Sequence, residues 1–402
     1  MEREVVALAV SIAVVIALLR FRVDLGITML VAAAALALAG GRAPLWALRE
    51  LGRAAIAKDT LLLLARIVAI IALGEVAAKL GYLNRLVTGL RQLIPDNRIV
   101  IALMPAFGGL LPMPGGAMLT APMVESSVPP GGATPEQKFF VNYWFRHVWE
   151  YIWPLYPGVV VGAALVGRRV SDISAHNWPL TLAAIAGGTV FVLRRVRAGR
   201  NERGGNGARQ AHRDVALGML PFAVVIAGVL VLKLEVVIVV LAVIALLVAF
   251  GRPAVRDVLR AFAHGVEYQV VTLIVGVAAY NQVLTEARII DAVPEMFVRL
   301  HMPVPLVICL VPMMLGLITG VTLAFIAVAF PLLLPLMGGP DVNMNLVMLA
   351  YASGFVGCLL SPVHLCLVLS RQYFKADLAS SYRLLLLPSL VVMAVAAVLA
   401  LV

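Results

Sequence analysis

Three ionisable residues stand close together inside one strongly apolar stretch of the chain. Arg146, His147 and Glu150 lie in the segment 139–166, where a charged side chain facing lipid is costly. On a helix, their spacing would let the Glu150 carboxylate pair with Arg146 or His147. Two interpretations fit equally well. In one, Arg146 or His147 binds an anionic substrate while His147 or Glu150 carries a coupling proton. In the other, an Arg146–Glu150 pair only holds a helix in place.

The second half of the chain contributes a further histidine, His364, within the apolar segment 343–370. It follows a Ser-Pro pair and is expected either to relay a coupling proton or to act as a structural hydrogen-bonding group. The segment 60–80 also carries ionisable residues, which are expected to pair with neighbouring helices. They are Arg66, Glu75 and Lys79.

Two other apolar segments, 99–124 and 305–336, are interrupted half-way by proline and glycine. As a helix, 99–111 would be about 20 Å long, too short to cross a bilayer core of roughly 30 Å. It ends in Pro112-Met113-Pro114-Gly115-Gly116, and its counterpart is interrupted at Ile318-Thr319-Gly320-Val321-Thr322. Proline removes a backbone donor and glycine frees the dihedral angles, so neither helix can continue. The pattern predicts two re-entrant hairpins; the alternative is two kinked ordinary helices.

Backbone groups left unpaired at such depth must be satisfied by protein or by a water-filled cavity. Helix N-termini and free amides there favour an anion, and free carbonyls can hold a cation such as Na⁺. The expected substrate-binding residues therefore belong to the hairpin tips and to the two polar segments that follow them. They are Pro112, Pro114, Gly115, Gly116, Thr120, Asn142, Arg146, His147, Thr319, Gly320, Thr322, Ser353 and Ser361, with His147, Glu150 and His364 as the proton-coupling residues.

No enzymatic motif is present. The chain contains no HExxH, GxSxG or P-loop sequence, so an enzyme is not expected. The three cysteines, Cys309, Cys358 and Cys366, lie in apolar segments without a CxxC or another metal-ligand spacing. They are expected to be core residues, and no metal or other cofactor is expected beyond a coupling H⁺ or Na⁺.

The composition indicates a membrane protein built of helices. Hydrophobic residues make up 62% of the 402 positions and charged residues only 13%, whereas about a quarter of a soluble domain is charged. An all-α membrane fold with about ten transmembrane helices and two re-entrant hairpins is predicted. The ten segments are 5–19, 24–39, 60–80, 139–166, 177–193, 214–232, 234–250, 268–286, 343–370 and 384–401.

The net charge of +11 is concentrated in the polar, arginine-rich stretch 194–213. In a multi-pass protein of the inner (plasma) membrane, such a stretch is a positive-inside signal, so it is expected to be cytoplasmic, with both termini outside. Contact with anionic lipid is a second interpretation, and nucleic acid is not expected as a partner. The stretch 42–58 has the pattern of an amphipathic helix at the membrane surface.

The same linker, 194–213, separates two halves, 1–193 and 214–402, that carry the same order of segments. An offset of 207 residues brings Pro105 onto Pro312, and an offset of 208 brings Pro154 onto Pro362. Each half contains five predicted crossings and one broken segment. Because five is odd, the second half would enter the membrane from the opposite side, which is an inverted-topology repeat.

Two stretches, Met104–Glu125 and Ser361–Ser370 followed by Tyr373-Phe374, carry a resemblance to a known group. The whole chain resembles an uncharacterised family of prokaryotic ten-helix integral membrane proteins of the ion-transporter superfamily. That family is distantly similar to gluconate permeases and divalent-anion symporters. The resemblance implies a homodimer in which a transport domain, roughly 60–166 and 268–370, moves like an elevator against a scaffold. The sodium-coupled dicarboxylate members of the superfamily carry Ser-Asn-Thr at each hairpin tip. In this chain the tips are Pro112-Met113-Pro114-Gly115-Gly116 and Ile318-Thr319-Gly320-Val321-Thr322 instead.

These observations together predict a secondary active transporter of a small organic anion, coupled to a proton or sodium gradient. A cation/proton antiporter that uses Glu150 and the histidines is the alternative within transport. A non-transport membrane protein that reuses the fold is the alternative from another class.

Overall fold

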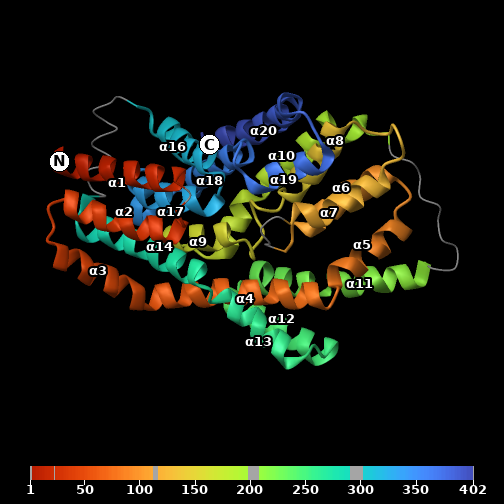
Figure 1. Cartoon of the computed structure of the whole chain (residues 1–402), viewed down its shortest axis with the longest axis horizontal. Coiled ribbons are helices and arrows are strands. Elements are labelled where there is room, and N and C mark those ends of the chain that lie inside the picture. The colour runs from red at the N-terminus through yellow and green to blue at the C-terminus, as the bar shows by residue number, and fades with distance from the viewer. Residues whose placement is uncertain (1, 22, 112–115, 198–207, 290–301, 402) are drawn as a thin grey trace.

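The computed structural model describes residues 2–21, 23–111, 116–197, 208–289 and 302–401. Within these ranges the chain forms helices and connecting turns and contains no strand, which confirms the all-α prediction for the described residues (Figure 1). The helices of the first half are α1 (Glu2–Arg20), α2 (Leu25–Ala39), α3 (Pro44–Ile56), α4 (Lys58–Lys79), α5 (Tyr82–Leu93), α6 (Asn97–Gly108), α7 (Ala117–Ser127), α8 (Pro135–Arg146), α9 (Pro157–Leu165) and α10 (Val170–Phe191).

The second half follows a comparable order. Its helices are α11 (Ala208–Val225), continued by a π-helical turn at Ile226–Val231, α12 (Val236–Gly251), α13 (Val255–Gly265), α14 (Tyr268–Glu286), α16 (Val304–Thr319), α17 (Thr322–Leu333), α18 (Met344–Leu359), α19 (Leu365–Phe374) and α20 (Leu378–Ala400). Residues 208–213, expected in the polar linker, belong to α11 because Ala, Arg and Gln are good helix formers.

Several of these helices are apolar enough to lie in a membrane. Among the described residues, four helical stretches are both long and apolar enough to cross a membrane by length and composition: Lys58–Lys79, Ala208–Val231, Val255–Glu286 and Leu378–Ala400. Six shorter helices, among them α2, α12 and α18, are also apolar. They indicate a membrane-associated protein, while the number of crossings and the inverted repeat stay predictions.

The two sequence halves are interleaved. In the described chain α2 packs against α14, α4 against α12 and α13, α5 against α11, and α10 against α20. Figure 1 shows α1, α2 and α14 side by side at one end, with α6, α7 and α8 at the other. The core is therefore shared between the halves.

Both interrupted segments form two consecutive helices that pack against each other across a break. In the first half these are α6 and α7, and residues 112–115 between them lie outside the described residues. In the second half α16 ends at Thr319 and is capped by Gly320, whose φ of 63° suits glycine, and α17 begins at Thr322. This is the packing expected of a hairpin in each half.

Candidate functional site

The candidate site lies where α8 stops inside the protein. Thr134 and Gln137 form a capping box that starts α8, and the helix is buried from Phe139 to its last residue, Arg146. The chain then runs without regular helix to Tyr156, and α9 begins at Pro157, a residue suited to the first turn. Because α8 ends at Arg146, the helical spacing expected between Arg146 and Glu150 is wrong.

Side chains from other helices satisfy the backbone of this break. Four consecutive or nearly consecutive carbonyls would otherwise be unpaired in an apolar interior, which is costly. Each accepts a hydrogen bond from a polar side chain: Val148 from Thr181 (2.9 Å), Glu150 from Tyr351 (2.8 Å), Tyr151 from Asn177 (3.1 Å) and Ile152 from Ser174 (2.7 Å).

The backbone carbonyls at the end of α6 also accept hydrogen bonds from side chains, which here belong to α8 and to the break after it. The last carbonyls of a helix have no partner within the helix. Here Gly108 accepts from Arg146 Nη1 (2.9 Å), Gly109 from the Tyr156 hydroxyl, and Leu110 from Trp153 Nε1 (2.9 Å). The break after α8 and the end of the first hairpin helix are therefore built as one unit.

A second break, between α18 and α19, faces the first. Tyr143 of α8 donates to the carbonyl of Leu359 at the end of α18 (2.9 Å), and Tyr382 of α20 donates to that of Leu360 (3.0 Å). The break carries His364, and α19 begins with the next residue. Two discontinuous helices from the two halves thus meet in the interior.

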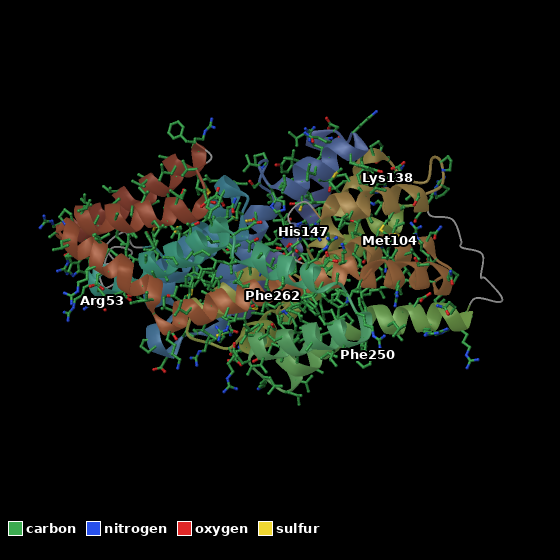
Figure 2. All side chains as sticks on the ribbon, turned by 60° about the horizontal axis from the view of Figure 1, so that its bottom comes forward. Arg53, Met104, Lys138, His147, Phe250 and Phe262 are labelled. Atoms are coloured by element: carbon green, nitrogen blue, oxygen red, sulfur yellow. The ribbon has the colours of Figure 1, made fainter. Side chains whose placement is uncertain are left out.

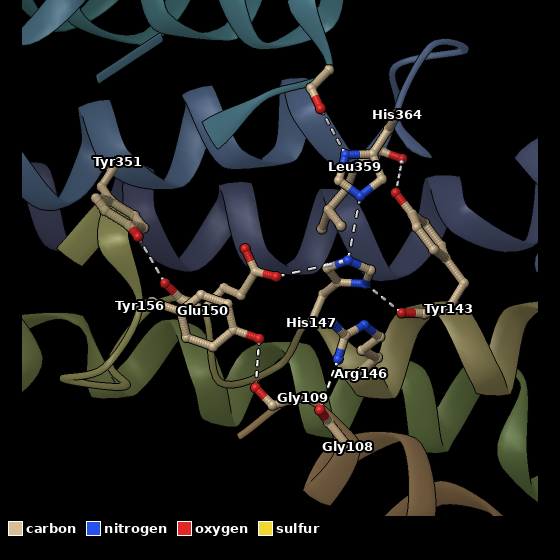
Figure 3. Close-up of polar contacts among 11 residues, drawn as sticks. Gly108, Gly109, Tyr143, Arg146, His147, Glu150, Tyr156, Tyr351, Leu359 and His364 are labelled. Carbon is tan, nitrogen blue, oxygen red and sulfur yellow. Dashed lines mark hydrogen bonds and ion pairs between the residues drawn. The ribbon is translucent and has the colours of Figure 1, made fainter. Parts of the chain in front are cut away.

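A pair of histidines joins the two breaks. The Nε2 atoms of His147 and His364 are 3.3 Å apart, and Glu150 Oε1 lies 3.7 Å from His147 Nε2 (Figure 3). His147 is 2% exposed and Glu150 9% exposed. Figure 2 shows His147 near the middle of the molecule, with Arg53 and Phe250 at its edges. His147 therefore contacts both of the other predicted proton-coupling residues, Glu150 and His364.

Predicted binding residues of the first hairpin and of α8 form a polar network beside this pair. The Thr120 hydroxyl donates to Asn142 Oδ1 (2.6 Å), and Asn142 Nδ2 donates to Ser370 Oγ (3.0 Å) and to the carbonyl of Ala117 (3.0 Å). These bonds join α7, α8 and α19.

Gly116, at the start of α7, seats the Arg146 guanidinium. A Cβ at this position would stand 2.5 Å from Nη2 of Arg146, so a larger residue would displace the guanidinium. Gly116 and Arg146 are thus in direct contact, as a site made of the first hairpin and α8 requires. Pro112, Pro114 and Gly115 lie outside the described residues.

The remaining predicted residues are spread more widely. Ser353 directs its hydroxyl to the carbonyls of Ala350 (3.1 Å) and Ile308 (3.5 Å), as a helix-packing residue does. Thr319 donates to the carbonyl of Leu315 (2.7 Å), and Ser361 is fully buried beside Gly320. Thr322 starts α17 against Gly158 at the beginning of α9.

The sequence interpretation missed Cys366, which was expected to be a core residue. Its Sγ and the nearest ring nitrogens of His147 and His364 all lie within 4.8 Å of one another. Ser370 and the tyrosines that donate to the breaks were missed as well. The His-x-Cys spacing places His364 and Cys366 close together in the sequence, but nothing in the sequence brings His147 to them.

A cavity of 1170 Å³ opens next to the second break. Its walls are α1 and the start of α2 on one side, and the tip of the second hairpin and the start of α19 on the other. Pro362 and Val363, which directly precede His364, line it together with Thr319 and Arg20. The cavity therefore borders the residues on both sides of His364, whereas His364 itself is not among its lining residues.

The ionisable residues of α4 pair with neighbouring helices, as the sequence predicts. Their partners are the residue that directly precedes α12 and two residues of α13. The pairs are Arg66–Glu235 (2.6 Å), Glu75–His264 (2.6 Å) and Lys79–Asp257 (3.5 Å).

Comparison with known proteins gives the chain a family. A search of curated proteins returns no match. The model of one family, described as protein of unknown function (DUF401), matches residues 3–402. Because that match spans nearly the whole chain, the protein belongs to this family.

Proposed function

We propose that the protein is a secondary active transporter of a small organic anion, coupled to a proton or sodium gradient across the inner membrane. The observation that carries the proposal is the meeting of two discontinuous helices around buried ionisable residues. Secondary transporters build their substrate and ion sites at such breaks. Ionisable residues inside a membrane usually mark the path of a substrate or ion.

Arg146 and the amides of the first hairpin would hold the anion, and His147, Glu150 and His364 would carry the coupling proton. The Thr120–Asn142–Ser370 network would position the hairpin against α8. The groups that would recognise the charge of the anion therefore come mainly from the first half, whereas the second half supplies His364 and hydroxyl groups.

Helix packing supports an elevator movement. One group consists of α6–α10 with α16–α20, because α10 and α20 pack on each other and on the broken helices. The other group consists of α1–α5 with α11–α14. This division differs from the 60–166 and 268–370 expected from the resemblance, since α4 and α14 pack mainly with α12, α13, α2 and α3.

The boundary between these groups is apolar and incompletely filled. Besides the 1170 Å³ cavity, one of 280 Å³ lies between α2, α4 and α14 on one side and α9 and α17 on the other. Tight interdigitation resists sliding, because packed interiors transmit strain. A loosely packed apolar boundary suits a moving group, and a homodimer formed by the other group would hold the scaffold still.

The test is uptake into proteoliposomes. Radiolabelled carboxylates and inorganic anions are offered under imposed proton and sodium gradients, and accumulation of at least one of them is expected. R146Q should abolish uptake, while R98Q is the matched control because Arg98 is partly exposed and pairs with Asp96. If no anion accumulated under either gradient, the proposal would be rejected.

A cation/proton antiporter is the second candidate, and the 3.7 Å contact between His147 and Glu150 favours it. Such a protein would exchange a bound proton for a cation at this pair. Proton release on addition of Na⁺ to the purified protein would support it, and a pH unchanged by Na⁺ would exclude it.

A further inference from the structure

The two histidines of the site have fixed tautomers. His147 Nδ1 lies 2.6 Å from the carbonyl oxygen of Tyr143, and His364 Nδ1 lies 2.8 Å from that of Gly320. A carbonyl oxygen only accepts, so both Nδ1 atoms carry the proton and donate. When both rings are neutral, both Nε2 atoms therefore present lone pairs, and they do so to each other at 3.3 Å.

Two lone pairs this close repel unless a positive species lies between them. The separation is that of two ligands on one tetrahedral metal ion. Zn–N bonds of about 2.0–2.1 Å at the tetrahedral angle place two nitrogens about 3.3–3.4 Å apart. Metal-binding histidines also commonly donate their other ring N–H to a backbone carbonyl, as both rings do here.

Two further ligand groups lie nearby. Cys366 Sγ lies within 4.8 Å of one ring nitrogen of each histidine, and Glu150, outside that group of three, has Oε1 3.7 Å from His147 Nε2. A thiol, two imidazoles and a carboxylate are ligand types that Zn²⁺ takes in tetrahedral sites. Sequence spacing could not reveal the set, because the two histidines are 217 residues apart.

We propose that His147, His364 and Cys366, with Glu150 as fourth ligand, bind a divalent transition-metal ion of the Zn²⁺ class. The nitrogen and sulfur donors select against Mg²⁺ and Ca²⁺, which prefer oxygen ligands. Binding displaces the thiol proton of Cys366 to water, and the thiolate and the Glu150 carboxylate then balance the two charges of the ion. The interior site would hold no net charge.

The ion would tie the two breaks together. His147 and Glu150 belong to the break after α8, His364 to the break after α18, and Cys366 to the first turn of α19. The cavity lined by Pro362, Val363 and Leu365 lies next to His364 in the chain. Metal binding would therefore make the two discontinuous helices move as one body.

The test is metal titration of the full-length protein in detergent, after removal of metal with a chelator. Co²⁺ replaces Zn²⁺ as a spectroscopic probe. One equivalent should give the visible bands of tetrahedral Co²⁺ and a thiolate-to-cobalt charge-transfer band, and Zn²⁺ should displace it. C366S should lose the charge-transfer band, and C358S, a buried cysteine of α18 outside the cluster, should keep it.

Affinity gives a second readout. H364Q should weaken Zn²⁺ binding at least about 10–100-fold, the loss that outer-shell partners alone cause. Variants are compared only where their thermal unfolding without metal matches that of the unsubstituted protein. A wild-type protein that binds neither Co²⁺ nor Zn²⁺, or a C366S protein with an unchanged cobalt spectrum, would overturn the proposal. Binding is measured without flux, so this result does not depend on anion transport. A bound ion would occupy the His147 and His364 nitrogens proposed to carry a coupling proton, so a positive result would leave sodium as the coupling ion of the transport proposal.

Discussion

At the scale of single residues, the site depends on buried backbone carbonyls and on the side chains that donate hydrogen bonds to them. The break after α8 survives in an apolar interior because hydroxyl and amide groups from other helices donate to it. Two neighbouring tyrosines show the contrast. Tyr351 donates to the carbonyl of Glu150, whereas the hydroxyl of Tyr151 is buried with no hydrogen-bond partner among the described residues.

This contrast gives a matched pair of substitutions. Y351F leaves the Glu150 carbonyl unpaired and should destabilise the protein by about 1–3 kcal/mol, the cost of a buried unsatisfied polar group. Y151F removes a hydroxyl that has no such bond, so it should be neutral or slightly stabilising. Thermal unfolding of both variants in one detergent measures the difference, and equal melting temperatures would contradict this hydrogen-bond assignment.

Sequence reasoning located the ionisable part of the site but not its full chemistry. Charged groups in an apolar stretch are conspicuous, so Arg146, His147, Glu150 and His364 could all be named in advance. Cys366 could not be distinguished from an ordinary core cysteine, because its partner ring His147 reaches it only when two breaks from opposite halves meet. The helical spacing assumed for Arg146 and Glu150 failed because α8 ends between them.

At the scale of elements, glycine allows the closest helix contacts. On α16 a Cβ at Gly316 would collide with the carbonyl oxygen of Gly354 on α18, and one at Gly357 would collide with that of Met313. Small residues let helix backbones approach where the surrounding lipid supplies no hydrophobic drive for association. The contact between α16 and α18 therefore fixes the second hairpin against the second broken helix.

G316A tests this contact. The added methyl meets backbone, which cannot rotate away, so α16 and α18 must separate at a cost of about 1–3 kcal/mol. G74A on α4 is the control, because a Cβ there meets nothing within 4 Å and alanine favours a helix. The melting temperature should fall for G316A and stay level or rise for G74A; equal falls would indicate that close packing is not the cause.

Most apolar helices could be placed from the sequence, whereas some of the amphipathic helices could not. The long apolar runs correspond to helices such as α4, α14 and α20 within a few residues. The amphipathic α3 was expected from its pattern, but α5 and α13 were not, since both helices are short and only one face of each is apolar. Where the two breaks meet depends on tertiary contacts that a single sequence does not display.

At the scale of the whole molecule, two groups of charges are prominent: ion pairs between helices and the basic stretch 194–213. The pairs of Arg66, Glu75 and Lys79 tie α4 to helices of the second half. The basic stretch 194–213 lies between α10 and α11, and its last residues extend α11. With this stretch in the cytoplasm, the larger share of the 32 Lys and Arg residues falls on that side.

Reporter fusions test this orientation. α20 has 23 residues, about 35 Å of helix, which is enough to carry the C-terminus across a bilayer core. A phosphatase that is active only outside the cytoplasm should be active when fused after Val402 and inactive when inserted within 198–207. A fluorescent protein that matures only in the cytoplasm should give the reverse pattern at the same two positions, which controls for expression. If both positions reported the same side, the five-crossing second half would be refuted, because an odd number of crossings must separate them.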